Sequence, residues 1–275
     1  MRRATCSLMS AGSLRALCVL PALLVLASCG PRPLTLPTGD ATPLSDPAPL
    51  LAALAHCGQA STITAEIGLS GRAAGQRIRG TLHAGFAPPD SVRLEAVAPF
   101  GGPIFVLAGG GGRATLLLPR DDRVLHDADP AAILEALSGL DAAPADLAAW
   151  VGGCPAAPLA VERPRRYGDE WIAADLSSQR RVWLAREPRG WQLRAITDAS
   201  LTIEFAGHSG SQPSRMRIRR AGGARDAPID LRLSLGQVER GLRLPDDAFT
   251  VAVPDGAIPI TIEDLRQSGP LRDRQ

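Results

Sequence analysis

Apolar residues recur at every second position in many short segments of this chain, and this pattern constrains the fold more than any other feature. In segment 229–235, four aliphatic residues alternate with Asp230, Arg232 and Ser234. A period of two is typical of a strand with one face on a core. The pattern predicts strands over 62–69, 77–86, 92–96, 104–108, 114–118, 171–176, 181–186, 190–196, 201–206, 215–219 and 229–235. About ten or eleven strands without a break in composition predict one antiparallel sheet curled around one core, in a mainly β protein of the α+β class.

Two of these strands are apolar on both faces. Segments 104–108 and 114–118 flank four glycines, Gly109 to Gly112, and need cover on both sides. Two helical patterns follow, one after Asp129-Pro130 and one after Pro144, and we expect these helices to provide the cover. Two further helices are expected, after Asp46-Pro47 and after Thr261.

An apolar run near the start ends in Leu26-Ala27-Ser28-Cys29. It spans about a dozen residues, which suits a signal-peptide core and falls short of the roughly twenty that cross a bilayer. The four residues resemble the lipobox of bacterial lipoproteins, which implies cleavage before Cys29 and acyl chains on that cysteine. The alternative is an ordinary secreted protein in which Cys29 has no role.

These features predict three parts of the chain. Residues 1–28 would be the signal peptide, 29–45 a Pro-rich tether, and 46–275 a single domain. Gly30 follows Cys29 where an Asp would retain an enterobacterial lipoprotein in the inner membrane. We therefore expect a lipid anchor in the cell envelope of a Gram-negative-type bacterium, in the outer membrane and facing the periplasm.

The cysteines predict one disulfide. Two of the five lie in the signal segment and Cys29 would carry the lipid, which leaves Cys57 and Cys154. In an oxidising compartment these two are expected to pair. Two buried free thiols are the alternative. Metal binding together with His56 is disfavoured, because two cysteines and one histidine offer too few ligands.

Charge and motifs exclude several functions. The 30 basic residues, all arginine, face 28 acidic residues, which gives a net charge of +2 without a basic block, so we expect no nucleic-acid partner. Segment Gly207–Ser211 departs from a hydrolase nucleophile elbow, because Ser211 stands where the second glycine should be. The glycines Gly109 to Gly112 join strand to strand and so place no helix under a phosphate. We expect no catalytic residue, no cofactor and no enzyme activity.

The stretch 79–155 carries a resemblance to a known family. It runs from a strand through the turn Pro99-Phe100-Gly101-Gly102-Pro103, two apolar strands around a glycine hairpin, and the helical segments Ala131–Leu137 and Leu147–Gly153. This order resembles the LolA/LolB superfamily, whose LolB type is an outer-membrane lipoprotein receptor. The resemblance implies a half-barrel sheet, a helical lid, and an apolar cavity between them that takes acyl chains. The chain departs from LolB in its length and in an extra segment near its end.

The resemblance also implies site residues. Phe100 would contact the membrane or an acyl chain, unless it folds back and plugs one end of the sheet. The cavity-lining candidates are Phe86, Ile104, Val106, Leu116, Leu118, Leu134, Leu137 and Trp150. A core filled by these same side chains is the alternative.

The expected function is a lipid-anchored protein that binds acyl chains or lipidated proteins. It would take part in outer-membrane lipoprotein or lipid trafficking, with a periplasmic carrier protein as a further partner. The competing hypothesis is a structural or assembly lipoprotein that uses its sheet as a protein-binding platform.

Overall fold

The computed structural model describes residues 34–59, 61–73, 75–98, 102–156, 159–176, 179–223 and 227–268. Cys29 and Phe100 lie outside these ranges, so their roles stay predictions. Residues Pro37–Gln275 form one compact unit, distinct from Met1–Leu36. The unit begins before the expected start at residue 46, since part of the expected tether already pairs with the sheet.

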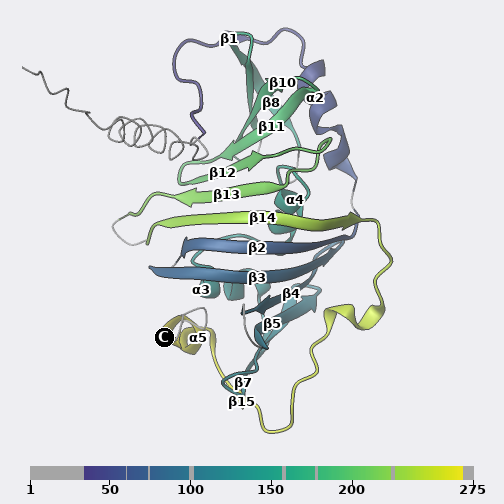
Figure 1. The fold of residues 1–275 in the computed structure, drawn as a ribbon, viewed down its shortest axis with the longest axis vertical. Helices are drawn as coiled ribbons and strands as arrows, with labels where there is room; N and C mark the ends of the chain where they lie inside the picture. Colours follow the sequence, from purple (N-terminus) through teal and green to yellow (C-terminus); the bar gives the residue numbers. More distant parts are fainter. Residues whose placement is uncertain are drawn as a thin grey trace, which may run out of the picture. The chain divides into compact units, whose positions relative to one another are not determined.

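Within the described residues, fifteen strands form one curved sheet that does not close on itself (Figure 1). The strands are β1 (Thr42–Pro43), β2 (Ile63–Ala73), β3 (Gln76–Ala87), β4 (Ser91–Val97), β5 (Pro103–Gly110), β6 (Arg113–Leu118), β7 (Arg123–Ala128), β8 (Val161–Tyr167), β9 (Trp171–Leu176), β10 (Arg181–Glu187), β11 (Gly190–Thr197), β12 (Leu201–Ala206), β13 (Arg215–Arg220), β14 (Ile229–Arg240) and β15 (Ile258–Pro259). A curved, mainly antiparallel sheet is therefore confirmed.

Four of these strands are additional to the predicted set. β1 and β15 have two residues each, too few for any periodic pattern. In β7 the neighbours Val124 and Leu125 are both buried, so its burial does not alternate. β8 contains Pro164 and a register irregularity between Glu162 and Arg165, which hides the period of two.

The sheet consists of two meanders that meet at one seam. Strands β2 to β7 follow one another on one side, β8 to β14 on the other, and β14 pairs with β2 in the middle. At the seam Gly71 lies so close to β14 that an added Cβ would be 2.0 Å from the carbonyl oxygen of Asp230. Its φ of +139° also favours glycine, so this position fixes how closely the two meanders approach.

The helices α3 (Pro130–Ser138) and α4 (Pro144–Val151) cover one face of the sheet (Figure 1). Asp129 caps α3 by accepting a hydrogen bond from the Ala131 amide at 2.9 Å, as the Asp-Pro start predicts. A third helix, α2 (Ala48–Leu54), continues as the 3-10 helix η2 (Ala55–Gly58) and contacts β11. None of the helices in the described ranges combines the length and the hydropathy needed to cross a membrane.

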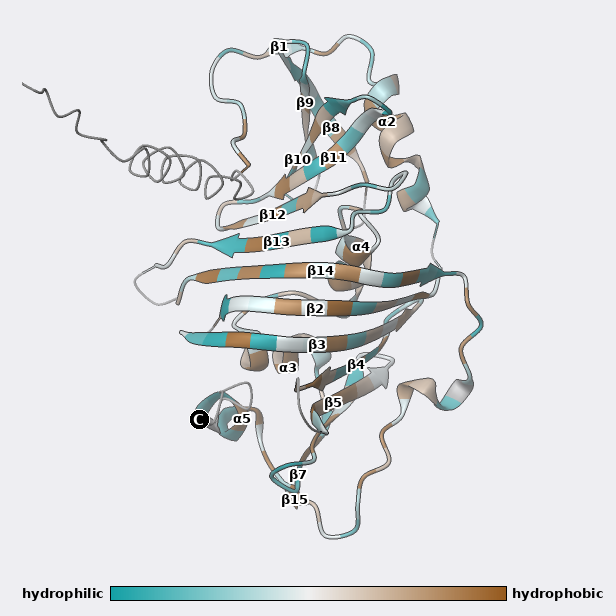
Figure 2. Ribbon diagram, in the orientation of Figure 1, coloured by the Kyte–Doolittle hydropathy of each residue, from teal (hydrophilic) through white to brown (hydrophobic). Residues whose placement is uncertain are grey.

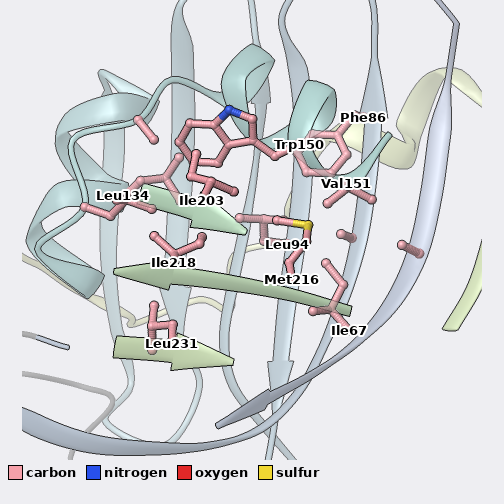
Figure 3. Close-up of a cluster of buried hydrophobic side chains, with 14 of the residues drawn as sticks. Ile67, Phe86, Leu94, Leu134, Trp150, Val151, Ile203, Met216, Ile218 and Leu231 are labelled. Carbon is pink, nitrogen blue, oxygen red and sulfur yellow. The ribbon is translucent and has the colours of Figure 1, made fainter. Parts of the chain in front are cut away.

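Side chains from the helices and the strands meet in one core cluster (Figure 3). Trp150 from α4 is fully buried and belongs to the same cluster as the strand residues Ile203 and Ile218. Every member lies between Leu50 and Leu265. The unit Pro37–Gln275 therefore carries its own core.

The segment after β14 covers the opposite face of β4 and β5. It forms the 3-10 helix η3 (Asp246–Phe249), which contacts both strands. Arg93 of β4 points to this face and donates from Nη1 to the carbonyl oxygens of Ala248 (3.2 Å) and Thr250 (2.9 Å). Of the two strands that are apolar on both faces, β5 is thus covered by the core on one side and by η3 on the other.

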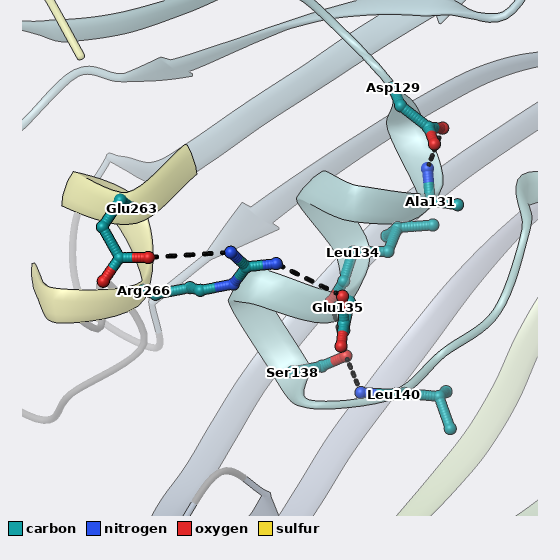
Figure 4. Close-up of polar contacts among 8 residues, drawn as sticks. All are labelled: Asp129, Ala131, Leu134, Glu135, Ser138, Leu140, Glu263 and Arg266. Carbon is teal, nitrogen blue, oxygen red and sulfur yellow. Dashed lines mark hydrogen bonds and ion pairs between the residues drawn. The ribbon is translucent and has the colours of Figure 1, made fainter. Parts of the chain in front are cut away.

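The last helix, α5 (Ile262–Ser268), packs against α3 (Figure 4). Leu265 is fully buried, and Arg266 Nη2 lies 3.5 Å from Glu135 Oε2 of α3. Thr261 caps α5 by accepting a hydrogen bond from the Asp264 amide at 3.2 Å. The C-terminal segment therefore joins the outer face of the sheet to a helix on its inner face.

Candidate functional site

A cavity of about 640 Å³ lies at the rim of the sheet, beside α4. Its other walls are the turn between β3 and β4, the end of η2, and Arg240 at the end of β14. Small-molecule pockets commonly measure about 300 to 1,000 Å³. The cavity is therefore large enough for a small ligand or part of an acyl chain.

The helix α4 presents small side chains to the cavity. Ala145, Ala148, Ala149 and Gly152 all line it, and their spacing of three, four and seven residues places them on one helix face. The other face of α4 carries Trp150 into the core. Because these side chains are small, they do not fill the space beside the helix.

The opposite wall is apolar and firmly held. Phe86 and the turn residues Pro88 and Pro89 line the cavity there. The next residue, Asp90, accepts hydrogen bonds from the amides of Gly111 (3.0 Å) and Gly112 (2.8 Å) in the β5–β6 hairpin. The glycine hairpin thus fixes the β3–β4 turn through its exposed amides.

A disulfide between Cys57 and Cys154 forms one end of the cavity. The two Cα atoms are 5.5 Å apart, and the bond ties η2 to the segment that follows α4. His56 Nε2 lies 3.4 Å from Cys57 Sγ. The trio of His56 and the two cysteines has its donor atoms within 4.8 Å of one another, but sulfurs joined to each other are not thiolate ligands for a metal.

Arg240 supplies the positive charge of the site. Its Nη2 donates to the carbonyl oxygen of Gly152, at the C-terminus of α4, and to Gln212 Oε1 at 3.2 Å. Gln212 in turn donates from Nε2 to the carbonyl oxygen of Val151 at 2.8 Å. No acidic side chain of the described residues pairs with Arg240, whose hydrogen-bond acceptors among them are uncharged.

Burial and Arg240 together keep His56 neutral. Burial lowers the pKa of His56, and the nearby positive charge of Arg240 lowers it further. The two acidic residues at the cavity are already engaged: Asp90 by glycine amides, and Asp146 by Arg180 Nη1 at 2.8 Å. The electrostatics of the site therefore favour an anionic group near Arg240.

The structure brings most of the predicted cavity residues together, but as members of the packed core. These core residues are Phe86, Leu116, Leu118, Leu134, Leu137 and Trp150, and Ile104 packs against them. Only Phe86 among them also lines the 640 Å³ cavity. Most of the predicted residues thus belong to the buried core cluster, and the 640 Å³ cavity lies beside that cluster at the rim of the sheet.

Val106 lies on the opposite face of the sheet from the core. It is buried but outside the core cluster, and its register partners on β4 and β6 are Glu95 and Leu117. Neighbouring strand residues point to opposite faces, so Val106 and its neighbour Leu107 cannot both face inward. Val106 shares the face that carries Arg93, which η3 covers.

Sequence reasoning missed the alanine face of α4 and Arg240. The signal for the first was present, since Ala145, Ala148, Ala149 and Gly152 recur at helical spacing. Arg240 gave no signal, because it reaches the site only through the long-range pairing of β14 with β2.

No protein-family model matches the chain. No curated protein matches it in sequence. Among solved structures it is similar to a LolA superfamily protein from Nitrosomonas europaea, at 12% identity and a TM-score of 0.43, over 70% of this chain and 90% of that one. A DUF1329 family protein from Desulfovibrio piger is similar at 11% identity and a TM-score of 0.42, over 73% of this chain and 94% of that one.

Proposed function

We propose that this protein is a lipid-anchored protein of the bacterial cell envelope that binds an acyl chain at the cavity beside α4. It would act in outer-membrane lipoprotein or lipid trafficking, receiving or passing on its ligand through a soluble periplasmic carrier. The proposed role involves binding and release without covalent chemistry.

The observation that carries this proposal is the make-up of the cavity wall. Ala148, Ala149, Phe86 and Pro89 offer apolar surface. Arg240 adds a positive charge beside them that no acidic side chain of the described residues neutralises. An acyl chain with an anionic head matches both features. Burial of the acyl chain stabilises the complex by about 25 cal/mol for each Å² of apolar surface that leaves water. A guanidinium binds a carboxylate or phosphate by charge-assisted hydrogen bonds.

The alternative function, a structural lipoprotein that binds another protein along its sheet, has less support than acyl-chain binding. At one edge of the sheet, only Thr42 and Pro43 of β1 pair with β8, so most of the outer edge of β8 is free within the described residues. However, β8 carries Pro164 and the exposed charges of Arg163 and Arg165. Prolines and charges of this kind protect an edge against pairing with another chain.

The test measures binding of a fluorescent fatty acid to the unit Pro37–Gln275, together with native mass spectrometry for copurified lipid. Ala148→Phe places a ring in the cavity and should weaken binding at least about tenfold, since a filled cavity loses its contacts with the ligand. Ala136→Phe is the matched control, because Ala136 is a half-buried alanine of α3 outside the cavity. A lipid-free protein that binds no probe, or equal binding by Ala148→Phe and the parent, would contradict the proposal.

A second measurement addresses Arg240. Arg240→Gln should weaken binding of the fatty acid but not of its methyl ester, which lacks the negative charge. The ratio of the two affinities removes any general effect of the substitution on α4. An unchanged ratio would leave Arg240 without a role in ligand binding.

A further inference from the structure

The outer face of the central strands carries a dense group of arginines. We call it the arginine face, and it consists of outward-pointing residues of β13, β14, β2 and β3: Arg72, Arg77, Arg79, Arg217, Arg219 and Arg232. They alternate with buried residues such as Ile218 and Ile78, which point to the core. The arginine face therefore lies on the side of the sheet opposite α3 and α4.

Strand register places these residues in two adjacent rows. One row runs across the sheet from Arg217 through Arg232 and Ser70 to Arg79. The next runs from Arg219 through Asp230 to Arg72 and Arg77. Because neighbouring strands lie about 4.8 Å apart, the guanidinium groups share one small surface.

Two of the six charges are compensated within the protein. Arg217 binds Asp230 through two hydrogen bonds of 2.8 and 2.9 Å, and Arg219 pairs with Glu204. Arg232 is exposed and lies 3.8 Å from the same Asp230.

The remaining three arginines stay uncompensated. No acidic side chain of the described residues pairs with Arg72, Arg77 or Arg79, and all three are exposed. Six guanidinium groups and two carboxylates leave a formal charge of +4 here, whereas the whole chain carries only +2. This group of residues therefore carries more formal positive charge than the chain as a whole.

Arg72 and Arg77 stand directly opposite each other on β2 and β3. Like charges in directly opposed positions destabilise a sheet. An anion between the two guanidinium groups would remove this repulsion. The pair therefore points to an anionic partner.

We propose that the arginine face binds the phosphate groups of anionic phospholipids at a bilayer surface. Guanidinium groups match phosphate oxygens in bidentate geometry and stay charged at all physiological pH values. Two adjacent rows of charges can bind several head groups at once, each through a weak contact. The inference rests on the proposed function only in that an acyl anchor would hold this face near a membrane and raise its effective concentration there.

The test is cosedimentation of the unit Pro37–Gln275 with phosphatidylcholine vesicles, with and without phosphatidylglycerol. The protein should bind only the anionic vesicles, and added salt should weaken the binding. Reversing three charges, in Arg72→Glu/Arg77→Glu/Arg79→Glu, should weaken binding by at least about a hundredfold, since the loss of each basic residue alone accounts for about fivefold. The matched control is Arg165→Glu/Arg189→Glu/Arg243→Glu, which makes the same charge change at exposed arginines elsewhere and should bind much more like the parent.

Several results would overturn the inference. These are an absence of binding to anionic vesicles, equal weakening by both triple variants, and saturable binding of inorganic phosphate without vesicle binding. Tighter binding of an acidic polypeptide such as polyglutamate would assign the face to a protein partner instead. The triple variant should keep the parent's affinity for the fluorescent fatty acid, so the outcome is independent of the cavity experiment.

Discussion

Removal of the Cys57–Cys154 disulfide is expected to cost this protein a large part of its stability. The two cysteines are 97 positions apart in sequence, so the bond closes a long loop in the unfolded chain. Loop-closure entropy for about 100 residues corresponds to about 4.7 kcal/mol at 25 °C. For a unit of this size, each kcal/mol shifts the melting temperature by about 2 to 4 °C, so the expected drop is about 9 to 19 °C.

The experiment compares the unit Pro37–Gln275 with its variant Cys57→Ala/Cys154→Ala by urea unfolding and calorimetry. The denaturant slope should rise in the variant, because its unfolded chain is less constrained and exposes more surface. Reductant should destabilise the parent and leave the variant unchanged. A loss below about 1 kcal/mol would refute the reasoning, since the loop would then contribute little entropy to the unfolded state.

Four further outcomes are expected. Leu265→Ala should cost about 2 to 5 kcal/mol in urea unfolding, because the side chain is fully buried where α5 meets α3. Asp175→Asn should destabilise the protein at pH 7 but progressively less below about pH 4. The hydrogen bond from Arg181 lowers the pKa of Asp175, so the parent's advantage holds above the unfolded pKa and fades as acid protonates the folded carboxylate. Cys29→Ala should move the protein from the membrane fraction to the soluble fraction on cell fractionation. Phe100→Glu should leave the melting temperature nearly unchanged and weaken vesicle binding if Phe100 is an exposed loop tip.

Local patterns predicted most of the strands and all the main helices. β14 was predictable because its buried residues alternate with charged ones, and α3 because Asp129-Pro130 is a strong helix start. β8 was not predictable, because Pro164 and the neighbouring arginines hide its alternation. Its place in the sheet depends on backbone pairing with β9, which side-chain periodicity does not record.

The candidate site was less predictable than the fold. Apolar residues such as Leu118 and Leu134 have the same pattern in sequence whether they fill a core or line a cavity. The cavity instead depends on where small residues stand and on long-range contacts that place Arg240 beside Gly152. The cover of the outer face by residues near Ala248 likewise depends on tertiary contacts, since that segment has no periodic pattern of its own.

The seam between β14 and β2 has a consequence for how the chain folds. Each meander can form from local pairings, but the seam joins segments far apart, as where Thr62 Oγ1 donates to the carbonyl oxygen of Leu242, 180 positions later. Non-local pairings of this kind slow folding, because the loop must close before the contacts stabilise it. Until β14 arrives, the edge of β2 is exposed in the middle of the future sheet. This partly paired intermediate is therefore the state most prone to aggregation through an unpaired strand edge.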